Sequence, residues 1–598
     1  MLHYSTHSWQ KRGGNTPTPE RPSAARRQWA IGGVLAVVLV GLTGRLAYWQ
    51  VIMHADLSAR ANLQHMQSLT LPSGRGMITD RNGTLLALTV TGDAIIIDPF
   101  AMQAAEKAQS GAFDRITTRI AVIANIAPDV VRPQLLLPTG YHAITDAMGA
   151  TVHLQPTVSE QFTHAIDAER LVGISLEPQS WRVAPNGALA SQVLGFVRGD
   201  TGAGQYGIEQ QYDHLLAGTP GQFLTAVDRW GNPIASAPQH LTPAIPGGQV
   251  TLTLDANIQV MAEQGLQQTL ATTGAVSGTV IIEDPQTGEI LALANAPGFD
   301  PNHYETANQT DFADASVAHI YDPGSTMKAL TMAMGIDSQV ITPQTTFEDP
   351  GYFTIGNQTI YNWNKLSWGT ETMTQVLTHS ANVGAAWVAV DQLGHDRFAR
   401  YLSAFGFGAP TGLALPGETA GLLPPPATNS DLQNLDLAEN AFGESIGVTP
   451  LQMVMAYGAL ANGGALMRPQ LVASTTNDGK TQRTPPAIVH HVITQQTAAT
   501  ITQMLVDSAL HSDAQTGLID GYTVAAKTGT STPNPSDPTQ TYASVLGYAP
   551  ADHARYVVLV KIDHPQSSVF GGAAAGPLWR SLVRQLMAYS HVPAPGGN

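Results

Sequence analysis

The chain has 598 residues, a formal net charge of −16 and only 12% charged residues. Its length predicts more than one folded domain. The acidic balance argues against nucleic acid as a partner, because binding the phosphate backbone requires clustered Lys and Arg. The absence of cysteine excludes disulfides, zinc–thiolate sites and iron–sulfur clusters, and no His-Glu-x-x-His pattern indicates a metal site.

The N-terminal segment has the pattern of a membrane anchor. Residues 1–27 form a polar tail with five basic residues and one acidic residue, and residues 28–53 are mainly apolar and carry no charge except Arg45. The apolar stretch is long enough to span a bilayer. The preceding basic flank predicts a cytoplasmic N-terminus, with everything after residue 54 on the outer side of the membrane. A cleaved signal peptide is the alternative, but its apolar core would be too long, and the nearby Ala-x-Ala has Arg60 at its centre.

Residues 55–245 are predicted to form an elongated, β-rich pedestal domain. Asn-Gly at 82–83 indicates a hairpin turn. Residues 89–98 and 189–197 have the pattern of strands, and a short helix is expected over residues 207–213. Since no catalytic pattern occurs in this region, we expect a folding, docking or dimerisation module.

Residues 246–590 form the second predicted domain, followed by a short tail over residues 591–598. Its strands lie at both ends of a mainly helical centre that extends to about residue 515. This order predicts an α+β domain in which the terminal segments share an antiparallel sheet, with helices on both faces and a helical lobe beside it. The predicted strands span residues 250–254, 278–283, 289–294, 524–530, 542–548 and 556–562, and the flanking helices span residues 256–271 and 572–589.

The first catalytic candidate is the Ser-x-x-Lys tetrad of Ser325 and Lys328. A turn precedes an apolar helix here, so the hydroxyl and the amine should lie on one face of the first helical turn. A serine hydroxyl needs a base to become a nucleophile, and lysine can be that base only if desolvation or a nearby cation lowers its pKa. The tetrad alone is a weak signal, since Ser8 and Lys11 form another in the polar tail.

Two further motifs strengthen the prediction. Ser380 and Asn382 form a Ser-x-Asn motif at the end of a helical segment, and residues 527–529 form a Lys-Thr-Gly triplet on a predicted C-terminal strand. The full ordered set of motifs is far rarer by chance than either short motif. Together with Ser325 and Lys328, these residues therefore predict an active site for acyl transfer.

Each residue of the set has a chemical role in this prediction. Ser325 attacks a carbonyl while Lys328 accepts its proton. Ser380 relays the proton toward the leaving amine, and Asn382 hydrogen-bonds Lys328 and the amide of the acyl substrate. No cofactor is expected, because Lys328 and the oxyanion donors perform the chemistry.

The Lys-Thr-Gly strand is predicted to bind the substrate. Lys527 supplies positive charge to the nucleophile and to a substrate carboxylate, assisted by the Thr528 hydroxyl. Gly529 leaves room for a substrate backbone to add along the strand edge. The backbone N–H groups of Ser325 and Thr530 are the expected oxyanion donors.

The three motifs in this order resemble the signature of the penicillin-recognising serine acyltransferases. Further segments are similar to class B penicillin-binding proteins, nearest the division (septal) type. The resemblance implies a peptidoglycan D,D-transpeptidase that cross-links stem peptides through a Ser325 acyl-enzyme with loss of D-alanine, and that β-lactams acylate. The segments that carry it are residues 75–83, 207–213, 322–328, 448–452, 547–550 and 571–572.

The resemblance also implies partners. A membrane glycan polymerase of the shape-elongation-division-sporulation (SEDS) family, together with other division proteins, is expected to dock on the anchor and the pedestal. Two positions depart from the family pattern: Glu444 stands where Gln is common, and Ala184 stands where Tyr is usual. Glu444 could alter the charge near the cleft or only its rim.

Three other functions stay open. The first is a transpeptidase of side-wall elongation. The second is a β-lactamase or β-lactam sensor, although no glutamate between Asn382 and Lys527 has the Glu-x-x-x-Asn arrangement of a class A lactamase. The third is a non-catalytic scaffold of the division machinery, which should have lost part of the catalytic set.

Overall fold

The structure is a computed structural model. It describes residues 24–592 except 59–65, 72, 138–139, 148, 150, 227–238, 414, 424–429, 513–518, 520 and 534–535. Ser8, Lys11 and almost all of both predicted tails therefore lie outside the described residues. The chain divides into two compact units, one of Met1–Leu71 with Gly221–Pro243 and the other of Pro72–Pro220 with Ala244–Asn598.

The first unit contains a membrane-spanning helix. Helix α1 (Ala24–Ala47) continues into a π-helical turn, η1 (Tyr48–Ile52). They contain a candidate span of 27 residues, Arg26–Ile52, in which an 18-residue window has a mean hydropathy of 2.0. This length exceeds the ~20 residues that a bilayer requires, so the prediction of a single N-terminal transmembrane helix is confirmed for the described part of the chain. The unit also contains an antiparallel sheet of three strands, β1 (Met66–Leu71), β9 (Gly221–Ala226) and β10 (His240–Thr242).

The N-terminal part of the second unit contains a long antiparallel pair of strands, β3 (Leu85–Ile97) and β6 (Ile174–Val183). The predicted turn at residues 82–83 is present, and it connects β2 (Ile78–Thr79) to β3. Buried residues of β3, including Ile95, pack against four helices. These helices are α3 (Pro99–Ala108), α4 (Ala112–Ala124), α5 (Pro128–Leu135) and α6 (Pro156–Glu169).

One sheet joins strands from both predicted domains. Its central order is β20-β19-β11-β2-β3-β4, with β5 (His153–Leu154) and β6 also paired to β3. Strand β11 (Gln249–Leu252), predicted from residues 250–254, lies between β2 and a strand about 220 residues further along the chain. The other members are β4 (His142–Ala143), β19 (Val472–Asn477) and β20 (Lys480–Arg483).

The predicted strand over residues 189–197 is wrong. Most of this segment is instead the short helix α7 (Ser191–Leu194), and only β7 (Phe196–Val197) is extended. The left-handed backbone of Ala190 (φ 55°) and the positive φ of Gly195 (76°) turn the chain at either end of the helix. All four residues of α7 are buried. The apolar run therefore correctly indicates a buried segment, but the segment is a helical turn and not a strand.

A buried ion-pair network links β6 to the segment that follows it. The Glu209 carboxylate is 2% exposed and lies 2.6 Å from Nε of both Arg75 and Arg182. The two arginine side chains are themselves only 8% and 9% exposed. Arg182 also donates to the carbonyl of Gly76, so one carboxylate holds three segments of the chain together.

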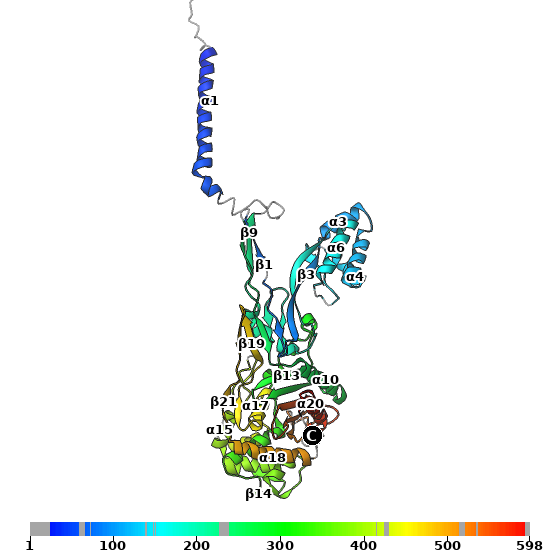
Figure 1. Cartoon of the computed structure of the whole chain (residues 1–598), viewed down its shortest axis with the longest axis vertical. Coiled ribbons are helices and arrows are strands. Elements are labelled where there is room, and N and C mark those ends of the chain that lie inside the picture. The colour runs from blue at the N-terminus through cyan, green and yellow to red at the C-terminus, as the bar shows by residue number, and fades with distance from the viewer. Residues whose placement is uncertain are drawn as a thin grey trace, which may run out of the picture. The chain divides into compact units, whose positions relative to one another are not determined.

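The antiparallel sheet predicted for residues 246–590 is confirmed with five strands in the order β13-β12-β24-β23-β22, but the predicted strand at residues 250–254 is not one of them, because β11 pairs with β2 and β19 instead. Helices α10 (Ala256–Thr273) and α20 (Gly576–Tyr589) pack together on one face (Figure 1). Helices α17 (Pro450–Ala461) and α18 (Gln495–His511) cover the other face. The strands are β12 (Ser277–Asp284), β13 (Glu289–Ala296), β22 (Ala525–Ser531), β23 (Tyr542–Ala549) and β24 (Tyr556–Asp563).

The helices that flank this sheet follow their local signals. Asp255 caps α10 as predicted, because its carboxylate accepts from the N–H groups of Asn257 and Ile258. The predicted last helix is divided at Ala575 into α19 (Gly571–Ala574) and α20. Pro577 lies in the first turn of α20, where its missing N–H costs no helical hydrogen bond.

The centre of the chain is mainly helical, as predicted, and also contains two-stranded sheets. Their strands are too short to give an alternating pattern in the sequence. The helices are α12 (Met327–Asp337), α13 (Met373–Thr378), α14 (Asn382–Trp387), α15 (His395–Ala404) and α16 (Ser430–Ala441), and the sheets include β14 (Thr346–Asp349) with β17 (Gly369–Thr372) and β15 (Tyr352–Ile355) with β16 (Gln358–Tyr361).

We predict that Glu209→Gln lowers the free energy of unfolding by about 3–5 kcal/mol, because it leaves the buried Arg182 guanidinium without its anion and leaves Arg75 only its contact with Asp213. Denaturant unfolding of the full chain in detergent measures the change. Glu160→Gln, at an exposed position of α6, is the matched control. Equal unfolding curves for the two variants would contradict the structural importance of the network.

Candidate functional site

Ser325 lies in a tight turn that leads into α12. The turn, η4 (Gly324–Thr326), packs against β22, and Gly324 has a φ of +57°. A Cβ atom at Gly324 would approach the carbonyl oxygen of Thr530 to 2.6 Å, so a side chain is excluded here. The fully buried Tyr457 donates its hydroxyl to the carbonyl of Thr326 at 2.7 Å, which fixes the turn from the other side.

Lys328 is fully buried, and its amine lies among oxygen atoms. Nζ lies 2.9 Å from Oγ of Ser325, 2.7 Å from the carbonyl oxygen of Ser380 and 2.7 Å from Oδ1 of Asn382. Two of these oxygens can only accept, whereas the Ser325 hydroxyl can also donate. A neutral amine fits this set, because it donates twice and accepts the proton of Ser325 with its lone pair.

The surroundings favour that neutral amine. Burial lowers the pKa of Lys328 well below its usual value, and the positive charge of Lys527 lowers it further, while the negative charge of Glu444 acts in the opposite direction. Lys328 can therefore accept the Ser325 proton near neutral pH. A lowered pKa is the condition under which the sequence predicts that Lys328 acts as the base.

Ser380 lies in the short connection between α13 and α14, and Asn382 is the first residue of α14. Ser380 has a φ of +57°, unusual for a residue with a side chain, and this conformation directs its carbonyl to Lys328. Its hydroxyl lies 3.2 Å from Nζ of Lys328 and 3.1 Å from Nζ of Lys527. Asn382 donates from Nδ2 to the carbonyl of Tyr361 at 3.1 Å, which orients Oδ1 toward Lys328.

Lys527 enters from the edge strand β22. Its side chain is buried, and burial lowers the pKa to about 8. Its amine lies 3.1 Å from the Ser380 hydroxyl, so this hydroxyl contacts the amines of both lysines. Among the described residues β22 pairs only with β23, so its outer edge could accept an extended peptide.

The structure gives a different reason for Gly529. A Cβ atom there would lie 2.7 Å from the carbonyl oxygen of Pro323 and 2.6 Å from Oγ of Ser544. The missing side chain thus lets β22 pack against the nucleophile turn, rather than only making room for a substrate. Thr528 and Thr530 are half-buried, and Thr530 accepts the N–H of Gly571 with Oγ1 at 3.0 Å.

Several residues that support the catalytic set could not be identified from the sequence. Tyr457 and Tyr361 position the site through single hydrogen bonds and belong to no motif. His379 precedes Ser380, forms a short hydrogen bond with the buried Glu371, and stacks on Trp368 at 4.1 Å. No spacing in the sequence indicates these partners, because they join segments that the fold brings together.

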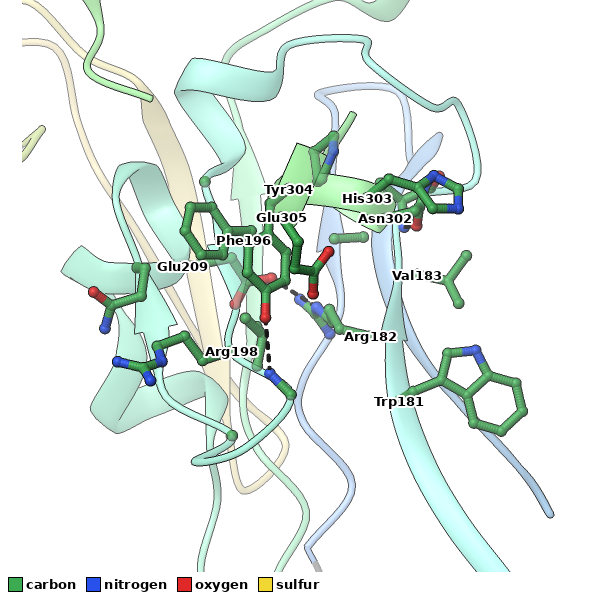
Figure 2. A pocket seen from close by; sticks show the side chains of 18 of the residues that line it. Trp181, Arg182, Val183, Phe196, Arg198, Glu209, Asn302, His303, Tyr304 and Glu305 are labelled. Carbon is green, nitrogen blue, oxygen red and sulfur yellow. Dashed lines mark hydrogen bonds and ion pairs between the residues drawn. The ribbon is translucent and has the colours of Figure 1, made fainter. Parts of the chain in front are cut away.

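A large hollow of about 1180 Å³ lies away from this set, beside β6. Figure 2 shows Phe196 and Tyr304 in it, and their rings stack at 4.1 Å. Arg182 and Glu209 line it as well, but none of the predicted site residues does. Within the described residues, no group of three or more His, Asp or Glu side chains could hold a metal ion.

Comparison with known families agrees with this geometry. The penicillin-binding protein transpeptidase domain matches residues 278–587, which is more than half of the chain. The penicillin-binding protein dimerisation domain matches residues 70–252. The chain belongs to the penicillin-binding protein transpeptidase family.

Similar proteins cover nearly the whole chain. Penicillin-binding protein PbpB of Mycobacterium tuberculosis is 31% identical over 94% of this chain and 84% of its own length. Peptidoglycan D,D-transpeptidase FtsI of Escherichia coli K12 is 28% identical over 92% of this chain and 90% of its own length. The crystal structure of Penicillin binding protein 3 from M. tuberculosis, complexed with aztreonam, has a TM-score of 0.66 and 27% identity, and covers 88% of this chain and 98% of its own.

We predict a bell-shaped pH dependence for acylation of Ser325 by a penicillin. The rate rises as Lys328 loses its proton, and it falls above about pH 8 as Lys527 loses the charge that attracts the penicillin carboxylate. Stopped-flow measurement of the acylation rate against pH checks this prediction. In Lys527→Arg, whose guanidinium stays charged, the alkaline fall should disappear; an identical fall in that variant would contradict the assignment.

Proposed function

We propose that the protein is a peptidoglycan D,D-transpeptidase that cross-links stem peptides through a Ser325 acyl-enzyme and that β-lactams inhibit. The observation that carries the proposal is the position of the buried Lys328 amine, within 2.9 Å of Ser325 Oγ and between Ser380 and Asn382. The family membership and the named D,D-transpeptidase relatives support the same reaction.

In the proposed acylation, the neutral amine of Lys328 takes the Ser325 proton as Oγ attacks the carbonyl of the penultimate D-alanine. The backbone N–H groups of Ser325 and Thr530 stabilise the oxyanion. The proton then passes from Lys328 through the Ser380 hydroxyl to the leaving amine of D-alanine. The C–N bond breaks, and Lys328 returns to its neutral form.

The rest of the site would hold the donor peptide. Lys527 and Thr528 bind its terminal carboxylate, Asn382 binds its amide, and the peptide backbone adds along β22 next to Gly529. The half-buried Thr528 and the unpaired outer edge of β22 support these roles.

We infer that the enzyme works at the division septum. Its relatives include the FtsI of E. coli and Stage V sporulation protein D of Bacillus subtilis, the latter 28% identical over 92% of this chain and 83% of its own length. A SEDS-family glycan polymerase and other division proteins would dock on the anchor and on the pedestal of residues 55–245. The N-terminus would lie in the cytoplasm and the catalytic domain of residues 246–590 on the periplasmic side of the inner membrane.

The test is labelling of the full-length protein by a fluorescent penicillin. A stable adduct is expected in the wild type and in Ser8→Ala, and none in Ser325→Ala, because Ser325 has the buried Lys328 as its base. Rapid drug turnover without an adduct would favour a β-lactamase instead. A folded protein that forms no adduct and does not turn the drug over would favour a non-catalytic scaffold.

A further inference from the structure

A turn after α16 brings Glu444 next to the nucleophile. The carbonyl of Gly443 accepts the N–H of Gly324 at 2.9 Å, so the residue before Glu444 is hydrogen-bonded to the residue before Ser325. This approach is close, because a Cβ atom at Gly443 would lie 2.2 Å from the carbonyl oxygen of Gly324. Glu444 is partly exposed to solvent, so a substrate can reach its side chain.

The conformation of this turn is held independently of the Glu444 side chain. The N–H of Glu444 donates to the carbonyl of Glu439, and Ser445 donates its hydroxyl to the Glu439 carboxylate at 2.5 Å. Among the described residues no hydrogen bond or ion pair is recorded for the Glu444 carboxylate. Its removal should therefore leave the turn intact.

The charges around Glu444 are mainly negative. Partial burial raises the pKa of Glu444 above its usual value, and the carboxylates of Glu439 and Asp322 raise it further, whereas the buried Lys328 lowers it. Burial also raises the pKa of Asp322, and the Glu439 carboxylate raises it further. A cation placed here would relieve this repulsion between carboxylates.

The reaction supplies such a cation. The acceptor in transpeptidation is a primary amine, which is an ammonium ion near neutral pH, and it must reach the carbonyl of the Ser325 ester. We propose that the Glu444 carboxylate binds this acceptor ammonium beside the acyl-enzyme. This inference rests on the proposed function and deepens it, because it assigns a recognition residue for the second substrate.

The protons of this step balance. The ammonium gives one proton to the neutral Lys328, and the free amine attacks the ester carbonyl. The C–N bond forms and the C–O bond to Ser325 breaks, with Lys328 returning its proton to Oγ. The new amide nitrogen loses a further proton, which the Glu444 carboxylate receives and passes to solvent.

The experiment measures how the acyl-enzyme divides between amine and water. A thioester analogue of a D-alanine-terminated stem peptide acylates the full-length protein, and thiol release reports acylation. Two acceptors are compared, D-alaninamide, which carries an ammonium, and hydroxylamine, which is uncharged near neutral pH. Mass spectrometry gives the ratio of transfer product to hydrolysis product for the wild type, Glu444→Gln, Glu444→Asp and the remote control Glu160→Gln.

We expect Glu444→Gln to lower the transfer ratio for D-alaninamide about fivefold, the effect of one partly exposed charge pair, and to leave the hydroxylamine ratio unchanged. Glu444→Asp should keep part of the preference, and Glu160→Gln should behave as the wild type. An unchanged ratio for D-alaninamide, or an equal loss for both acceptors, would overturn the inference. Absence of thiol release from the folded wild type would instead overturn the proposed function on which it rests.

Discussion

The buried amine of Lys328 is the group on which the rest of the site depends. An ammonium ion enclosed in this way is costly unless it is fully paired, and Glu444, the carboxylate that favours the charged form of Lys328, forms no ion pair with it and is partly exposed. A neutral amine avoids that cost and matches the acceptors of Ser380 and Asn382. The same burial that packs α12 into the core therefore creates the base that Ser325 needs.

This constraint explains why distant segments converge here. The turn that carries Ser325 must lie close to β22, which requires glycine at both 324 and 529. The loop that carries Ser380 must take a left-handed conformation to direct its carbonyl inward. Tyr457 fixes the turn by donating its hydroxyl to the carbonyl of Thr326. The sheet, the helical lobe and the core helix thus each supply one part of a single hydrogen-bonded cluster.

Most of the fold could be predicted from the sequence, because its strands and helices carry strong local signals. The anchor, the capped helix after Asp255 and the C-terminal strands follow from hydropathy, capping and alternation. The strand predicted over residues 189–197 was wrong, since an apolar sequence alone does not distinguish a buried strand from a buried helical turn. The parallel pairing of β11 with β2 could not be predicted either, because it depends on a contact between strands far apart in the chain.

The site was predictable where motifs place residues close in sequence. Ser325 and Lys328 lie one helical turn apart, so their contact follows from helix geometry. The contributions of Tyr457, Tyr361 and Glu371 did not follow, since each comes from an element that only tertiary structure brings near. The sequence likewise did not show whether Glu444 changes the charge near the cleft or only at its rim. The hydrogen bond between the N–H of Gly324 and the carbonyl of Gly443 places Glu444 next to the nucleophile turn.

The most direct test is an NMR titration of the full-length protein labelled with ¹³C at lysine Cε. The chain has only seven lysines, and Lys328→Arg identifies the resonance that matters. Lys328 should be neutral at pH 7, because burial and the positive charge of Lys527 lower its pKa well below the usual value for lysine. If Lys328 keeps the ordinary pKa of an exposed lysine, it cannot be the resting-state base, and the central claim is wrong.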